Sequence, residues 1–315
     1  MATMSVWLNY KNPLVRDLAW AIGSPALITS NPQHLLQNHL AGDAQTPAAS
    51  NNYWPEPSWF ETQSQAYLPV LDQLERNPEP LADILKALKS PSLGIYFEAL
   101  LTYWLTTSKR YLLLQRNLPI RAINPASGHQ TTIGEFDFIV LDKLTNKTLH
   151  WEVAIKYYLG LGNIEYPWQW FGPNKKDRLD LKLKHLLHKQ TKLSNHPASK
   201  RILDNLGIQI DETWVILKGY LFYPFNSPTQ HPAFLSQSHL RGDWQKASEF
   251  ERCEEVQQWK KLDRTQWLCE HENIFLNTAV NNSSYTSPTY SPEYYTNINN
   301  KTKSQRRFIV PDLWF

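Results

Sequence analysis

Four stretches of the chain are rich in the β-branched and aromatic residues that favour strands. They are YLLLQRNLPIRAI (111–123), IGEFDFIVLD (133–142), TLHWEVAIKYYL (148–159) and TWVILKGYLFYP (213–224). Between the second and the third stretch lies DKLTNK (142–147), whose composition is typical of a hairpin turn. The sequence therefore predicts an antiparallel pair at the centre of the chain.

Two segments around these strands have helical patterns. Residues 93–105 (LGIYFEALLTYWL) are apolar nearly all round, which indicates a buried helix, and Ser90-Pro91 or Ser92 can cap it. Residues 175–193 place Leu179, Leu183, Leu186 and Leu187 on one stripe. The resulting order is helix, three strands, helix, strand. This αβββαβ order predicts an α/β fold around a mixed central sheet.

The pattern divides the chain into three regions. Residues 1–90 are expected to form a helical region that packs on the core, residues 91–224 the core itself, and residues 225–315 an irregular extension. Within the extension we expect a Trp-bearing helical stretch over about 247–269. The run 278–300 is rich in Asn, Ser, Thr and Tyr and has no hydrophobic period, so it is expected to be a flexible loop. The final RRFIVPDLWF is expected to dock as a strand.

Composition narrows the class of protein. Apolar residues make up 42% of the 315 residues and charged residues 19%, as in globular proteins. The net charge of +3 is close to neutral, so a case for nucleic-acid binding must rest on local clustering. The two cysteines, Cys253 and Cys269, form no CxxC pair, which argues against a disulfide scaffold or a cysteine zinc site. The N-terminal segment lacks the unbroken apolar run of a signal peptide or membrane span, and we expect a cytoplasmic protein with no membrane contact.

Acidic residues on the two middle strands carry the candidate chemistry. Side chains alternate across a strand, so Glu135 and Asp137 share one face, and Glu152 shares another with Lys156. If the hairpin pairs these strands, Asp137 and Glu152 can reach a single ion. Carboxylate oxygens suit Mg²⁺ or Mn²⁺, which keep several waters and accept phosphate oxygens from a substrate. Such an ion activates water and stabilises charge on a phosphodiester.

GEFDFIV (134–140) followed by WEVAIK (151–156) resembles the PD-(D/E)XK nuclease superfamily, whose core order is also αβββαβ. The resemblance covers about residues 92–223 and implies a restriction-endonuclease-like core. Over most of its length the chain is also similar to an uncharacterised bacterial family placed near that superfamily. The stretches that carry this second resemblance are GEFDFIV, HWEVAIKYYL, GPNKKDRLDLKLKHLL, LKGYLFYP and FIVPDLW.

The resemblance implies a role for each matching residue. Asp137 and Glu152 would be the metal ligands, Lys156 the catalytic lysine and Glu98 an accessory acid. One departure concerns the lysine, which the superfamily places two residues after the acid, where this chain has Ala154. Lys156 lies four residues on, about 13 Å along an ideal strand rather than about 6.6 Å. A β-bulge and the long lysine side chain would shorten that gap.

The second helical region is strongly basic. Residues 172–201 contain nine Lys or Arg and two Asp. A basic face opposite the leucine stripe would bind phosphates in a salt-dependent way. Its candidate nucleic-acid contacts are Lys175, Lys176, Arg178, Lys182, Lys184 and Lys189.

Each feature has a simpler interpretation. The acid pair can be the solvated face of a hairpin, Glu98 can pair with an arginine, Lys156 can be a strand-end lysine, and the basic helix can be plain surface. Three functions therefore remain open: a Mg²⁺- or Mn²⁺-dependent nuclease acting on DNA or RNA, an inactive nuclease-like module that binds nucleic acid, and a structural or protein-interaction domain.

Overall fold

A single mixed sheet runs through the computed structural model of this chain. The structure describes residues 5–28, 54–123, 128–227, 231–253, 256–269, 292–297 and 305–315. Within these described residues the sheet has nine strands, in the order β1-β2-β3-β5-β6-β9-β8-β7, with β4 paired to β3 off this path. The strands are β1 (Tyr111–Ile123), β2 (Gln130–Asp142), β3 (Lys147–Gly160), β4 (Trp170–Phe171), β5 (Glu212–Pro224), β6 (Leu240–Lys246), β7 (Trp259–Lys261), β8 (Glu293–Asn297) and β9 (Arg306–Val310).

The direction of the strands changes at β3. β1, β2 and β3 form an antiparallel meander, whereas β5 runs parallel to β3 and β6 and β9 continue in parallel. β8 and β7 are antiparallel to their neighbours. The crossover from β3 to the parallel β5 contains the second core helix, as parallel pairing requires.

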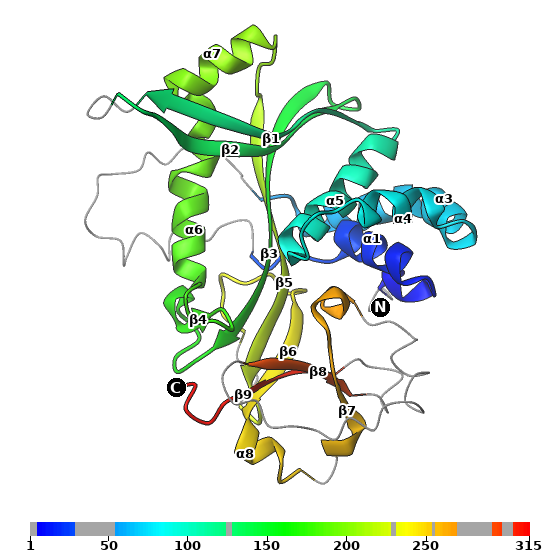
Figure 1. The fold of residues 1–315 in the computed structure, drawn as a ribbon, viewed down its shortest axis with the longest axis vertical. Coiled ribbons are helices and arrows are strands. Elements are labelled where there is room, and N and C mark those ends of the chain that lie inside the picture. The colour runs from blue at the N-terminus through cyan, green and yellow to red at the C-terminus, as the bar shows by residue number, and fades with distance from the viewer. Residues whose placement is uncertain are drawn as a thin grey trace.

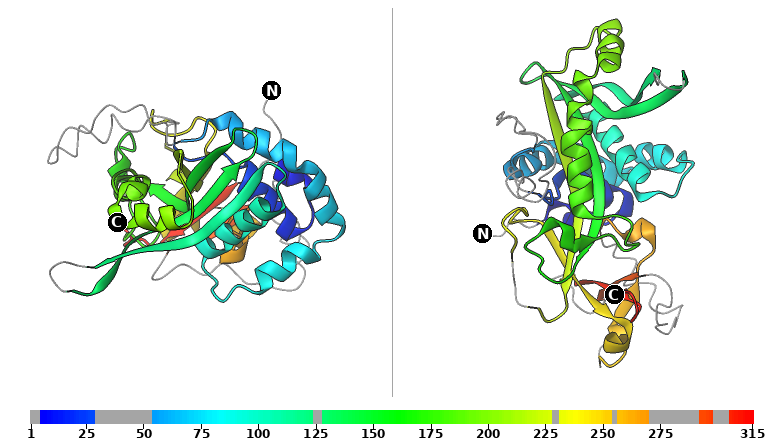
Figure 2. Two further views of the ribbon diagram at one scale, coloured as in Figure 1. Left: turned by 90° about the horizontal axis from the view of Figure 1, so that it is seen from above. Right: turned by 90° about the vertical axis from the view of Figure 1, so that its left-hand side faces the viewer.

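Helices cover the two faces of the sheet (Figure 1). On one face lie α1 (Pro13–Gly23), α3 (Pro57–Arg76), α4 (Glu79–Lys86) and α5 (Leu93–Thr107). On the other lies α6 (Leu179–His188), followed by the 3-10 helix η3 (Gln190–Asn195) and α7 (Pro197–Asn205). Figure 2 shows the far end of the β1–β2 hairpin extending beyond the helices. The remaining short elements are η1 (Val6–Asn9), η2 (Pro167–Gln169), α8 (Ala247–Phe250), η4 (Val256–Gln258) and η5 (Arg264–Gln266).

Each face of the sheet has its own apolar core. Trp151 on β3 stacks on Trp214 of β5 with ring centroids 6.2 Å apart, and Trp59 of α3 meets both edge-on at 5.5 Å. On the opposite face, the predicted leucine stripe of α6 is confirmed, because its members are buried against β5 and Tyr158 of β3. The burial of these rings and leucines is the main favourable term in holding the layers together.

The structure confirms the predicted αβββαβ order over residues 93–224. The expected turn between β2 and β3 is present, and Asp142 fixes its base. This buried carboxylate accepts two hydrogen bonds from the Arg110 guanidinium, at 2.9 and 2.6 Å, and one from the backbone N–H of Leu144. Burial alone would raise the pKa of Asp142, but these hydrogen bonds outweigh it and hold that pKa below its usual value.

The regions outside the core join the same architecture. Helices α1, α3 and α4 are all N-terminal, and β6, β9, β8 and β7 extend the sheet with C-terminal residues. The expected terminal strand is confirmed as β9. Most of the loop expected at 278–300 lies outside the described residues, although 293–297 within it form β8.

The helix expected over about 247–269 is wrong. Among the described residues of this range, the only α-helix is the four-residue α8, the other helical turns are the short 3-10 helices η4 and η5, and Trp259 begins strand β7. β7 pairs with β8, and Trp259 packs against Phe250 and contacts Arg307 through its ring face. Pairing and packing with segments distant in sequence therefore override the local helical pattern. Among the described helices, none is both long and apolar enough to cross a bilayer.

Candidate metal centre

The site lies where strands β2 and β3 separate. Their antiparallel pairing runs from Asp142↔Lys147 to Phe138↔Trp151 and ends there. The next residues on the two strands are Asp137 and Glu152. Beyond this point β3 stays paired to β5, and its last two residues also pair with β4. The Asp137 carboxylate takes the place of the missing strand contact, since its Oδ2 accepts the backbone N–H of Val153 at 2.9 Å.

Strand β1 and helix α5 add a third acid. Asn117 of β1 lies between the pairs Arg116↔Phe138 and Leu118↔Phe136, which places it opposite Asp137. Its backbone has a φ of 49°, a left-handed conformation that non-glycine residues seldom adopt in a strand. The Asn117 amide donates to Glu98 Oε2 over 3.4 Å. Glu98 on α5 is therefore linked to the strand position beside Asp137.

Glu152 is buried, with 3% of its surface exposed. The Nε2 amide of Gln190 lies 3.2 and 3.1 Å from its two carboxylate oxygens. Gln190 begins η3, which packs closely on β2 because Gly134 has no side chain: a Cβ there would lie 2.8 Å from Cδ1 of Leu193. The close approach of η3 to β2 thus sets the position of the Glu152 carboxylate.

The three acids repel one another. Burial raises the pKa of Asp137 and of Glu152, and the negative charge of Asp137 raises that of Glu152 further. Burial also raises the pKa of Glu98. The charge of Glu98 acts on both strand acids in the same direction. Carboxylates that raise one another's pKa, in surroundings that disfavour negative charge, are stabilised by a nearby cation.

Lys182, not Lys156, is the lysine whose charge acts on both strand acids. It lies on α6 and is half-buried, so burial lowers its pKa while Glu152 and Asp137 partly restore it. The ammonium group of Lys156 instead forms an ion pair with Asp177, in the loop before α6. Tyr158 donates a hydrogen bond to the same Asp177 carboxylate at 3.2 Å.

His150 lies on β3, two residues before Glu152, and its ring is next to the Glu152 carboxylate. Its ring is fully buried, and burial lowers its pKa to about 3, so the ring is neutral. Nε2 lies 3.8 Å from Glu152 Oε2, which is too long for a hydrogen bond. Phe136 packs edge-on against the ring at 4.7 Å. A neutral imidazole next to Glu152 adds no positive charge to the site.

The residues predicted to form the basic face have different environments. Lys176, Lys184 and Lys189 are exposed. Lys175 is exposed too, but its ammonium group lies over the rings of Trp314 and Phe315, at 5.7 and 4.8 Å. The Arg178 guanidinium donates two hydrogen bonds to Asp180, at 2.6 and 2.9 Å.

A bound ion would rest on few protein ligands. Among the described residues, no three His, Cys, Asp or Glu side chains converge in a group that would hold a metal. Asp137 and Glu152 offer two carboxylates that need charge compensation. Two carboxylates fit Mg²⁺ or Mn²⁺ better than Zn²⁺, because the harder ions complete their shell with water and substrate oxygens.

The sequence pattern alone did not identify three contributors to the site. Gln190 and Asn117 carry no motif, and their roles follow from the close packing of η3 and from the backbone conformation of β1. Lys182 was assigned to the basic face, although it directly precedes Leu183 of the buried stripe. That position could have indicated a side chain at the edge of the helix–sheet interface.

The family model described as Domain of unknown function (DUF1853) matches residues 16–294 of the chain. No curated protein and no solved structure gives a significant match.

Proposed function

We propose that this chain, which belongs to the family described as Domain of unknown function (DUF1853), is a divalent-metal-dependent nuclease that hydrolyses phosphodiester bonds in nucleic acid. The observation that carries the proposal is the pair of the half-buried Asp137 and the buried Glu152, where β2 and β3 separate, with Lys182 as the cation that acts on both. The αβββαβ core and its resemblance to the PD-(D/E)XK superfamily support it at the level of the fold.

Asp137 and Glu152 would hold one Mg²⁺ or Mn²⁺ ion. When bound, such an ion lowers the pKa of water and stabilises the charge that develops on the phosphate. The Val153 N–H and the Gln190 amide keep the two carboxylates in place before the ion arrives. Glu98 would accept a hydrogen bond from water at the edge of the site. Lys182 would stabilise negative charge on the reacting phosphate, the role that the resemblance gives to Lys156.

Cleavage assays with the full chain test this proposal. We expect hydrolysis of single- or double-stranded DNA or RNA with about 5 mM Mg²⁺ or Mn²⁺ and none with EDTA, because the acid pair needs an ion to act. Asp137→Asn and Glu152→Gln, which keep the shape of each side chain, should reduce the rate at least about a hundredfold. Asp204→Asn, at an exposed position on α7, is the matched control. Undiminished cleavage in both acid variants would refute the assignment.

A second candidate is a nuclease-like module that binds nucleic acid without cutting it. The observation that favours it is the ion pair between Lys156 and Asp177, together with Ala154 at the usual lysine position. For this function, salt-dependent binding would persist in Asp137→Asn, and no divalent ion would produce cleavage.

A further inference from the structure

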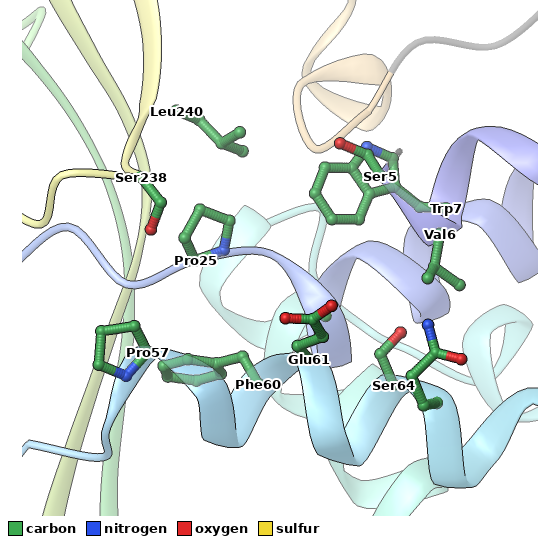
Figure 3. A pocket seen from close by; sticks show the side chains of 12 residues that line it. Ser5, Val6, Trp7, Pro25, Pro57, Phe60, Glu61, Ser64, Ser238 and Leu240 are labelled. Carbon is green, nitrogen blue, oxygen red and sulfur yellow. The ribbon is translucent and has the colours of Figure 1, made fainter. Parts of the chain in front are cut away.

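A cavity of about 210 Å³ lies on the opposite side of the sheet from α6, between the N-terminal helices and the start of β6. Its walls come from three parts of the chain: η1, the end of α1 and the first half of α3, with two residues next to β6 closing one side. The lining includes Trp7, Pro25, Phe60, Glu61, Ser64 and Leu240. Figure 3 shows Glu61 and Ser64 projecting from α3 towards the space between Pro25 and Trp7.

Helix α3 presents one continuous face to this cavity. Its lining residues are Pro57, Phe60, Glu61, Ser64 and Gln65, a spacing of three and four that places them on one side of a helix. Phe60 and Ser64 are buried and form the floor, whereas Pro57, Glu61 and Gln65 are exposed at the rim. The cavity is therefore open to solvent along the edge that carries Glu61.

Glu61 is the only charged residue in the lining of this cavity. Among the described residues, its carboxylate has no hydrogen-bond or ion-pair partner. The amine of the buried Lys218 is engaged elsewhere: its Nζ donates to the carbonyls of Ala21 and Ile22, at 2.7 and 2.9 Å. The Glu61 carboxylate is exposed at the rim, where a cationic ligand can therefore pair with it.

The floor of the cavity is closely packed beneath Glu61. Ser64 is 1% exposed, and its hydroxyl Oγ is buried without a hydrogen-bond partner in the described structure. Gly23, also in the lining, leaves room for that hydroxyl, because a Cβ there would lie 2.7 Å from Oγ.

Aromatic surface completes the chemistry. Trp7 and Phe60 belong to the walls, and the electron-rich faces of such rings attract cations. Phe60 already has one such contact, with Lys218 Nζ 4.4 Å from its centroid. The cavity also lies at the C-terminal end of α1, where the helix dipole favours positive charge.

We propose that this cavity binds a small organic ammonium ion, with Glu61 as its counter-ion and Trp7 as its aromatic wall. A volume of about 210 Å³ suits a compact apolar body below drug size. The site lies on the α3 side of the sheet and does not depend on the proposed nuclease activity.

Benzylammonium is a suitable probe, and the full chain is titrated with it by calorimetry and by saturation-transfer NMR. Benzyl alcohol and benzoate have the same ring with neutral and negative groups. We expect benzylammonium to bind at least about tenfold more tightly than benzyl alcohol, and benzoate not to bind. Glu61→Gln should remove that preference, and Glu61→Lys should abolish binding of the cation. Both changes are at an exposed position, so the fold should tolerate them.

Glu79→Gln is the control, because Glu79 is an exposed acid on α4 that does not line the cavity. Trp7→Leu should weaken benzylammonium binding while leaving the Glu61 charge in place. Equal affinity for benzylammonium and benzyl alcohol would overturn the proposal. So would unchanged benzylammonium binding in Glu61→Gln, or no binding to the unmodified chain at about 10 mM ligand.

Discussion

The side-chain amide of Gln190 donates to both carboxylate oxygens of Glu152, at 3.2 and 3.1 Å, although the two residues come from η3 and β3. The same amide also lies 3.4 Å from the carbonyl of Glu135 on β2. The Gln190 side chain therefore connects β2 and β3 at the point where these two strands separate. Its position fixes the carboxylate that the proposed metal would need.

Replacement of Gln190 by Leu should weaken metal binding without unfolding the protein. Loss of an outer hydrogen bond to a ligand carboxylate typically reduces metal affinity about 10- to 100-fold. Calorimetric titration with Mn²⁺ measures the effect, and circular dichroism checks the fold. Lys192→Met, at an exposed position of the same 3-10 helix, should leave the affinity unchanged. An unaltered Mn²⁺ affinity in Gln190→Leu would show that the amide does not position Glu152.

The two lysines near the site should differ in importance. Lys182 acts on both acids, whereas Lys156 is paired with Asp177, so Lys182→Met should slow cleavage at least about a hundredfold. Lys156→Met should have a smaller effect on the rate. Single-turnover rates at saturating metal make the comparison, with Lys86→Met, at an exposed position of α4 outside the basic face, as control. A larger loss in Lys156→Met would return the catalytic role to that residue.

The stability of the metal-free protein should fall as the pH rises. Burial raises the pKa of Asp137 to about 6 and that of Glu152 to about 8 in the folded state. Between pH ~4 and about 8 the folded chain therefore binds more protons than the unfolded chain, and a rise in pH within this window favours unfolding. Glu152→Gln removes one buried charge. It should therefore stabilise the metal-free protein at pH ~9 by on the order of 1 kcal/mol or more, and much less at pH ~4.5.

Urea unfolding in EDTA at these two pH values measures the difference. Glu251→Gln, at an exposed position, should not show the same pH dependence. If Glu152→Gln raises the free energy of unfolding equally at both pH values, the Glu152 carboxylate is not protonated more readily in the folded state than in the unfolded state.

Salt dependence should separate the free lysines of the basic face from the engaged ones. Lys176, Lys184 and Lys189 are exposed. Replacement of all three by Gln should weaken nucleic-acid binding. It should also reduce the slope of the logarithm of the binding constant against the logarithm of salt concentration, by up to about 0.9 for each lysine that contacts a phosphate. Fluorescence anisotropy at several salt concentrations gives this slope. Lys86→Gln on α4, which lies on the other face of the sheet, is the control (Figure 1). An identical slope in the triple variant would place the interface elsewhere.

Gly219 of β5 should be intolerant of any side chain. Its φ is 132°, and a Cβ there would lie 1.7 Å from the carbonyl oxygen of Lys156 on β3. Gly219→Ala should therefore destabilise the fold by about 3 kcal/mol or more, since the obstructing atom is backbone. Gly207→Ala is the matched control, because Gly207 also has a positive φ, of 65°, but no atom lies within 4 Å of its Cβ position. Gly207→Ala should lower the free energy of unfolding, measured with urea, by about 1 kcal/mol.

The sequence by itself determined the order of the core elements. The buried helix, the three strands, the leucine-striped helix and the fourth strand lie where composition and spacing predicted them, because each pattern reflects the burial of one face. The approximate place of Asp137 and Glu152 followed from the hairpin turn. The C-terminal helix prediction was wrong because strand β7 gains pairing with β8, which no local pattern contains.

Only the tertiary structure decided how the site is built. The separation of β2 and β3, the hydrogen bond from Val153 to Asp137 and the hold of Gln190 on Glu152 all join residues far apart in the chain. The same is true of the lysines. The family resemblance assigned the catalytic role to Lys156, whereas in the structure Lys156 pairs with Asp177 and the charge of Lys182, on α6, acts on the acids. Periodicity records which side of an element is buried, whereas charge and hydrogen bonding depend on which elements meet.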